Sequence, residues 1–304
     1  GIRDKLVTGV RRVLFRSYQP DHAILLEAGI VQIMVEEMFA RTIHDEPVNS
    51  KNEAAAILAN IFESGVELEN LQVNVHGHTM ASDYIIHNII LWIKNSTPED
   101  FSINLIRILL CLLKFPKASA TIVSVVKGTE ASYNLTELIN NPNEELGIVS
   151  IKLLMILASF MGHTLSDRLC KTKGQPESLI ANPTEVGLIT EKHAVSANFL
   201  AKLPHQNITL NLALLNKNAV PKIIESITWI QRTGTRASRY ASTYLEGLVG
   251  TLVRFTTTLY DYRVLSLVRD YNFTSLFTEL IMKTSSDEVQ KLSAFGLKNL
   301  SEQS

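Results

Sequence analysis

The feature that most constrains this chain is one helical pattern that occurs six times. Its copies cover residues 52–64, 103–115, 147–160, 192–204, 244–256 and 290–302. Each copy spaces its apolar residues three and four apart, which is the pattern of a helix with one buried face. When the copies are aligned, one large apolar residue near the end of each copy shares a position, and we call it the anchor: Ile61, Phe115, Phe160, Leu203, Phe255 and Leu300. Three residues before the anchor every copy has a leucine: Leu58, Leu112, Leu157, Leu200, Leu252 and Leu297. Such repetition predicts a chain of equivalent, stacked units.

The spacing of the copies indicates the kind of unit. Successive anchors are 54, 45, 43, 52 and 45 residues apart, whereas armadillo and HEAT repeats run about 40 to 47 residues. A second amphipathic helix is expected ahead of most copies, over residues 28–39, 83–94, 130–140, 219–230 and 272–283. A shorter first helix is expected at residues 118–126, 165–171, 208–215 and 262–270. Three helices per unit favour armadillo over HEAT repeats.

We therefore predict an all-α, right-handed solenoid of about six armadillo-type repeats over residues 1–304. The approximate repeats are 18–65, 72–117, 118–162, 163–205, 206–257 and 258–304. Stacked repeats bury a continuous core, and the third helix of each is expected to line a concave groove. Gly1–Leu14 already has a helical pattern and the chain begins with Gly rather than Met, so we expect a piece of a longer protein.

Composition excludes several classes of protein. Hydrophobic residues make up 46% of the chain and charged residues 19%, which suits a packed core and not a disordered chain. The net charge of −1 gives no general attraction to nucleic acid, so none is expected as a partner. The longest apolar runs, 103–115 and 148–162, fall short of the ~20 residues that span a bilayer. The only cysteines, Cys111 and Cys170, suit reduced thiols in a cytosolic or nuclear compartment.

The third helices supply the candidate binding residues. In the alignment of the six copies, the residue just before the anchor and the residue seven positions earlier are expected to face the groove. Five of these positions carry cations: Arg107, Lys114, Lys152, Lys202 and Arg254. They would form a basic track able to bind an acidic peptide, a phosphate or an anionic lipid headgroup. The alternative is a solvated surface, because charged residues must face water somewhere. Asn60 and Asn299 stand where armadillo repeats commonly place an asparagine that bonds to the backbone of an extended peptide.

Signals for chemistry are weak. His76, His78 and His87 are the best candidates for a metal site, but zinc needs three or four converging ligands and no further ligand completes the set, which favours a polar loop. Cys170 precedes Lys171, which could lower the pKa of its thiol, yet no general base is identifiable and an idle thiol is favoured. No phosphate-binding glycine loop, nucleophile elbow or zinc-protease motif occurs. We expect no catalytic residue, metal or cofactor.

Several longer segments carry a resemblance to a known family. They read NEAAAILANIFESGVELENLQVN, NLIRILLCLLKFP, GHTLSDRLCKTKGQPESLI, KHAVSANFLAKLPHQN and SSDEVQKLSAFGLKNLS. These segments resemble the armadillo region of plant U-box ubiquitin ligases of the senescence-associated type, over nearly the whole chain. In that family a U-box recruits a ubiquitin-conjugating enzyme. The armadillo array behind it selects the substrate or partner and can contribute to plasma-membrane association.

The resemblance implies that this chain is the recognition half of such a ligase. No U-box is found in the sequence, so a ubiquitin-conjugating enzyme would bind only through a U-box absent from this chain, and whether the chain counts as part of an enzyme stays open. The implied location is the cytoplasm, with peripheral contact at the inner face of the plasma membrane. Two functions remain: substrate or partner recognition for an E3 ligase, or a non-enzymatic armadillo adaptor or membrane-tethering scaffold.

Overall fold

The computed structural model describes residues 29–40, 49–65, 74–95, 98–172, 175–181, 183–185 and 187–303. The helix expected at Gly1–Leu14 and the start of the first predicted repeat lie outside these residues. The chain divides into two compact units, Gly1–Ala131 and Ser132–Ser304, which are described separately. In both units the described secondary structure is helical, with only one isolated β-bridge, between Val75 and His78.

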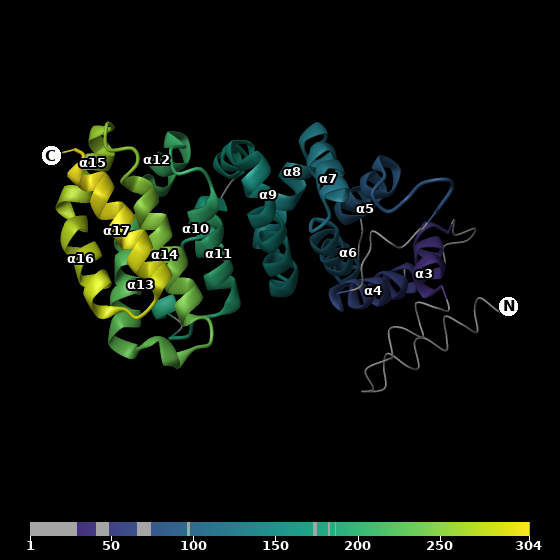
Figure 1. Ribbon diagram of the computed structural model, residues 1–304, viewed down its shortest axis with the longest axis horizontal. Helices are drawn as coiled ribbons and strands as arrows, with labels where there is room; N and C mark the ends of the chain where they lie inside the picture. The colour runs from purple at the N-terminus through teal and green to yellow at the C-terminus, as the bar shows by residue number, and fades with distance from the viewer. Residues whose placement is uncertain are drawn as a thin grey trace. The chain divides into compact units, whose positions relative to one another are not determined.

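The first unit consists of paired helices (Figure 1). Its described helices are α3 (Ile30–Phe39), α4 (Asn49–Glu63), α5 (Asp83–Asn95), α6 (Glu99–Leu112) and α7 (Pro116–Gly128), followed by the first residue of α8 (Ala131–Glu137). α3 packs on α4, α5 packs on α6 and α7, and the two predicted third helices, α4 and α6, pack on each other. Side-by-side packing of third helices is the arrangement that the repeat pattern predicts.

The second unit shows the same packing of predicted third helices. It contains η2 (Leu138–Asn140), α9 (Glu144–Lys171), α10 (Gln175–Ser178), η3 (Pro183–Glu185), α11 (Glu191–Lys202), α12 (Ile208–Asn216), α13 (Ala219–Thr233), η4 (Thr235–Ala237), α14 (Ala241–Phe255), α15 (Tyr262–Asp270), α16 (Phe273–Lys283) and α17 (Asp287–Ser301). α11 packs on α9 and α14, and α14 packs on α17, so the predicted third helices lie next to one another.

The recurring leucines form the core, as expected. All six predicted segments are helical, in α4, α6, α9, α11, α14 and α17. The first five leucines are at most 2% exposed, and Leu297 on α17 is half-buried. The anchors are less uniform, because Phe160 is 52% exposed and Phe115 lies beyond the end of α6, at the N-cap of α7.

The predicted break between a third helix and the next first helix is present as a kink. We expected helices at 147–160 and 165–171, and α9 covers both, with non-helical φ/ψ angles at Met161 (−145°, 37°) that separate two helical stretches. The four residues between the predicted helices contain one glycine and no proline, so a helix can resume directly after the kink. After the kink Met161 takes the buried position expected of Phe160, and its side chain is only 4% exposed.

Two helix starts are capped by side chains. The Asn143 side chain accepts a hydrogen bond from the backbone N–H of Leu146 at the start of α9. The hydroxyl of Ser286 accepts one from the N–H of Val289 at the start of α17. Both bonds satisfy backbone donors that have no partner within the helix.

Among the described helices, α9 has the length and apolar composition of a membrane span. Most of its apolar window, 61%, is buried against the rest of the protein. Burial of that kind is what the core helix of a packed unit shows.

Candidate protein-binding site

The predicted site residues of the first unit form one hydrogen-bonded cluster and one separate cation. Arg107 on α6 reaches across to α4, where its Nε and Nη2 donate to the two carboxylate oxygens of Glu63, each at 2.7 Å. Its Nη2 also donates to the Oδ1 of Asn60, at 2.9 Å, and its Nη1 to the Oδ1 of Asn104. The charge of Arg107 is therefore matched by Glu63. Lys114 is exposed and has no ion pair among the described residues.

In the second unit, Lys152 and Lys202 differ in the same way. Lys152 on α9 forms an ion pair with Glu191 on α11, with 2.7 Å between Nζ and Oε1. Lys202, at the end of α11, is exposed, and none of the ion pairs found in the described segments includes it. Of the five predicted cations, Lys114 and Lys202 therefore remain as exposed charges without a carboxylate partner in the part of the chain that the structure describes.

Arg254 contradicts the prediction that it faces a groove, because its side chain is fully buried. Its guanidinium lies at the C-terminal end of α11, where it donates to the carbonyl oxygens of Leu200, Leu203 and Pro204. Its Nε donates to the Oδ1 of Asn211, at 2.6 Å. The last carbonyls of a helix lack partners and carry partial negative charge, so a buried arginine is well placed there. Burial lowers the pKa of Arg254 to about 9.

The close approach of α14 to α11 explains this burial. A Cβ atom built at Gly247 would lie 2.7 Å from the backbone nitrogen of Asn198, and one at Gly250 would lie 2.8 Å from the Cβ of Ala201. Only glycine fits at such contacts. From Tyr244 to Phe255 every residue of α14 is buried except Glu246, which is half-buried. The basic track therefore does not extend over α14.

Asn299 is used inside the protein. Its amide Nδ2 donates to the hydroxyl of Thr256, at 3.0 Å, in the segment that follows α14. Asn60 is exposed on α4 and accepts the bond from Arg107 described above. That either asparagine binds a partner's backbone stays a prediction, as it does for Arg107, Lys114, Lys152 and Lys202.

Sequence reasoning missed two exposed apolar side chains on α9. Ile156 is 40% exposed and Phe160 is 52% exposed, and they lie one turn apart on the same side of the helix. Phe160 was placed in the core by its register. The sequence did contain a signal that Phe160 is exposed. Leu154, Leu157 and Met161 also follow three- and four-residue spacing, and a buried face made of these three residues does not include Phe160.

The residues singled out for chemistry are not arranged for it. Burial raises the pKa of the Cys170 thiol, and Asp167 raises it further, which is opposite to an activated thiolate. His78 stacks on Tyr84, with ring centroids 4.3 Å apart, in the tight turn that includes His76. Within the described segments no three His, Cys, Asp or Glu side chains come together as metal ligands would.

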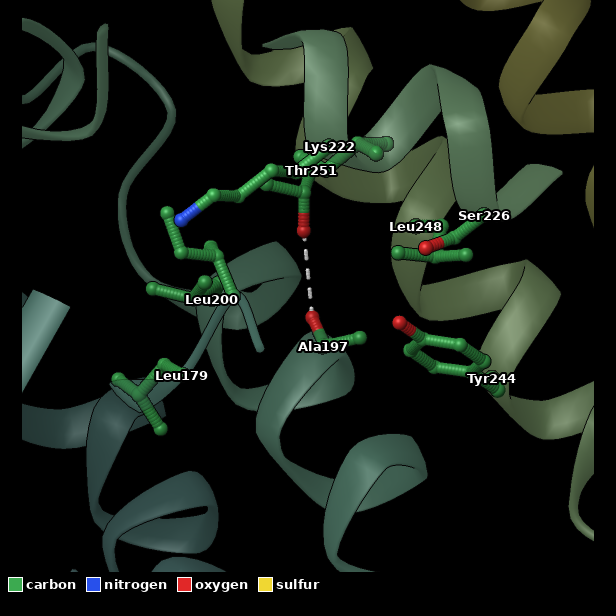
Figure 2. Close-up of a pocket in the computed structure, with 10 residues that line it drawn as sticks. Leu179, Ala197, Leu200, Lys222, Ser226, Tyr244, Leu248 and Thr251 are labelled. Carbon is green, nitrogen blue, oxygen red and sulfur yellow. Dashed lines mark hydrogen bonds between the residues drawn. The ribbon is translucent and has the colours of Figure 1, made fainter. Parts of the chain in front are cut away.

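The second unit also contains a small cavity between α11, α13 and α14 (Figure 2). Its volume is about 10 Å³, which is room for about one water molecule. The hydroxyl of Thr251 points across it and donates to the carbonyl oxygen of Ala197, at 3.2 Å. Burial raises the pKa of Tyr244, which also lines it, to about 12. This cavity is a packing feature and too small for an organic ligand.

Comparison with solved structures identifies the class of fold. A designed armadillo repeat protein matches over 89% of this chain and 99% of its own, with a TM-score of 0.61 and 12% identity. Another designed armadillo repeat protein, in complex with the peptide (KR)4, matches over 88% of this chain and 98% of its own, with a TM-score of 0.59. The chain therefore has an all-α, armadillo-type solenoid fold, as predicted.

Comparison with curated proteins narrows the class. The chain is 59% identical over 297 residues to U-box domain-containing protein 42 of Arabidopsis thaliana, covering 96% of this chain and 29% of that protein. It is 32% identical to U-box domain-containing protein 43 of the same plant, over 94% of the chain and 35% of that protein. The predicted resemblance to plant U-box proteins is thus confirmed. The chain spans about a third of their length, and no protein-family model matches it.

Proposed function

We propose that this chain is the partner-recognition region of a plant U-box E3 ubiquitin ligase. The observation that carries the proposal is the 59% identity to a U-box domain-containing protein across 96% of this chain. In such a protein a U-box would bind the ubiquitin-conjugating enzyme, and the armadillo repeats would hold the substrate or a regulatory protein. The peptide complex of a designed armadillo neighbour supports protein binding as the use of this fold.

The binding residues would lie on the exposed parts of the third helices. Lys114 in the first unit and Lys202 in the second are exposed cations without ion pairs among the described residues. An exposed lysine binds a partner's carboxylate by a charge-assisted hydrogen bond. Arg254 is excluded from this role by its burial.

The experiment uses the 304-residue chain as a competitor in plant cells. Proteins that co-purify with the chain are identified, and their ubiquitination is measured with and without its overproduction. A recognition region without a conjugating domain should occupy its partners and lower their ubiquitination. The Lys114→Glu, Lys202→Glu double variant should keep its helicity, bind fewer partners and compete less.

Partners that bind the chain while their ubiquitination stays unchanged would instead support the non-enzymatic adaptor. Absence of any specific partner would contradict recognition altogether. We also propose a cytoplasmic location with peripheral contact at the inner face of the plasma membrane. Fractionation of the tagged chain tests this location, since it predicts a salt-extractable membrane fraction.

A further inference from the structure

The α9 helix exposes apolar surface where the neighbouring third helix exposes a charge. We define the α9–α11 face as Ile156, Ser159 and Phe160 on α9 together with Lys202 on α11. All four side chains are exposed. Isolated apolar residues on a surface are ordinary, but two large ones adjacent on a helix and bordered by polar groups are typical of interaction sites.

Contacts at both ends of the two helices place these residues together. At one end Lys152 of α9 pairs with Glu191 of α11. At the other, Gly162 packs so closely on Pro204 that a Cβ built on the glycine would lie 2.6 Å from the proline Cδ. The part of α9 before the kink thus runs parallel to α11, and Phe160 and Lys202 both lie near the C-terminal ends of these two stretches.

The next third helix, α14, offers no comparable surface beside α11. α14 is buried from Tyr244 to Phe255 apart from the half-buried Glu246. The predicted binding surface on α9 and α11 therefore does not continue onto α14.

The charges around the face favour an acidic partner. Glu191 is already matched by Lys152, so it does not neutralise Lys202. Glu144 and Glu145 lie in the first turn of α9, about 16 Å or more along the helix from Ile156. Lys202 thus remains an exposed cation beside an apolar surface.

We infer that the α9–α11 face binds a peptide segment in which an aspartate or glutamate lies close to a large apolar side chain. The apolar side chain would cover Ile156 and Phe160 and remove them from water, and the carboxylate would accept hydrogen bonds from the Nζ of Lys202. This inference rests on the proposed function, because it names the chemistry of the partner that the chain would recognise.

The test measures binding of the whole chain to short synthetic peptides. One set combines leucine or phenylalanine with aspartate or glutamate at varied spacing. A second set replaces the acids with lysine, and a third replaces the apolar residues with serine. We expect retention of the first set only. Phe160→Ser should weaken binding about tenfold, the loss typical of a central apolar contact, and Lys202→Glu should weaken it several-fold and most at low salt.

Two matched variants control for folding and for general surface effects. Tyr262→Ser removes an aromatic ring that is 79% exposed on α15, and Lys291→Glu reverses an exposed lysine on α17. Both should bind like the unaltered chain, and circular dichroism should show the same helicity for all four variants.

Three results would overturn the inference. These are failure of the unaltered chain to retain any peptide of the first set, equal binding of the lysine set, and unchanged binding by both Phe160→Ser and Lys202→Glu. Binding to phosphatidylserine vesicles in place of peptides would likewise assign the face to membranes. If the peptides do not bind but the chain still lowers ubiquitination of its partners, this inference fails while the proposed function stands.

Discussion

The α4–α6 pair and the α11–α14 pair place an arginine between neighbouring third helices in opposite ways. On α6, Arg107 remains partly exposed and forms an ion pair with the carboxylate of Glu63 on α4 at the protein surface. On α14, Arg254 is fully buried and meets only carbonyl oxygens of the backbone and of Asn211. One arginine joins two helices through a surface ion pair, whereas the other closes the end of its neighbour.

Helix spacing accounts for the difference. In the common register Arg107 corresponds to Gly247, and Lys114 corresponds to Arg254. Because α14 has a glycine at the first of these positions, it can approach the backbone of α11. Arg254, two helical turns after Gly247, then lies within reach of the carbonyl oxygens at the end of α11. With arginine at the position of Gly247, α6 carries a long side chain along the seam with α4. Equivalent positions of the predicted groove are therefore exposed at Lys114, just after α6, and buried at Arg254 on α14.

The largest expected effect comes from separating α14 from α11. Gly247→Ala adds a Cβ that would lie 2.7 Å from the backbone nitrogen of Asn198, and backbone cannot move aside as a side chain can. We expect a loss of about 3 kcal/mol in the free energy of unfolding, measured as a lower Tm. Gly128→Ala on α7, where a Cβ meets nothing within 4 Å, is the control and should be neutral or stabilising. Equal effects of the two changes would contradict the close packing of α14 on α11.

Removal of the buried guanidinium should come next. Arg254→Met leaves the carbonyls of Leu200, Leu203 and Pro204 without this donor, but it also removes the cost of burying a charge. We expect a net loss of about 2 kcal/mol in urea unfolding. Arg254→Lys, which keeps the charge but not the forked donors, should also be destabilising. A fully stable Arg254→Met variant would show that the end of α11 does not need this contact.

The corresponding change in the other pair should be smaller. Arg107→Met breaks an ion pair whose side chains are 23% and 44% exposed, and such pairs contribute about 1 kcal/mol or less. The same urea titration should therefore show a shift clearly below that of Arg254→Met. A loss as large as that of the buried arginine would remove the distinction between the two helix pairs.

The smallest expected effect is a pH dependence confined to the second pair. Burial lowers the pKa of His193 and of His205, so the folded state binds fewer protons than the unfolded state just below the usual imidazole pKa of about 6.5. This stability is present above that pH and is lost as the pH falls below it. The Nδ1 of His193 must also be unprotonated to accept the N–H of Thr190 at the start of α11.

His193→Gln tests this dependence, because glutamine completes the same capping box without titrating. The fall in Tm on acidification should be shallower in this variant than in the unaltered chain, with the share from His205 remaining. α4 and α6 contain no histidine. An identical pH slope in both proteins would rule out His193 as a contributor.

The sequence predicted the helices well because periodicity reports burial directly. The leucine row and the break near Met161 were found from local pattern alone. The pattern did not show that the break is only a kink, because Gly162 is compatible both with a loop and with a continuing helix.

The candidate site was harder to predict, since exposure depends on how closely neighbouring helices approach. The register placed Arg254 and Lys202 in equivalent positions, and the register alone does not separate them. The distinction lies in the two glycines of α14 and in the carbonyls of another helix. Small residues on adjacent third helices, such as Gly247 opposite Ala197, are the signal from which a closed seam could have been inferred.

The kink in α9 has a consequence for how the second unit loses its structure. Residues before the kink belong to the predicted third repeat and those after it to the predicted fourth. Because Met161 leaves the helical conformation, the two stretches are expected to open separately, each with the repeat in which it packs. Amide exchange should therefore proceed at different rates before and after Met161.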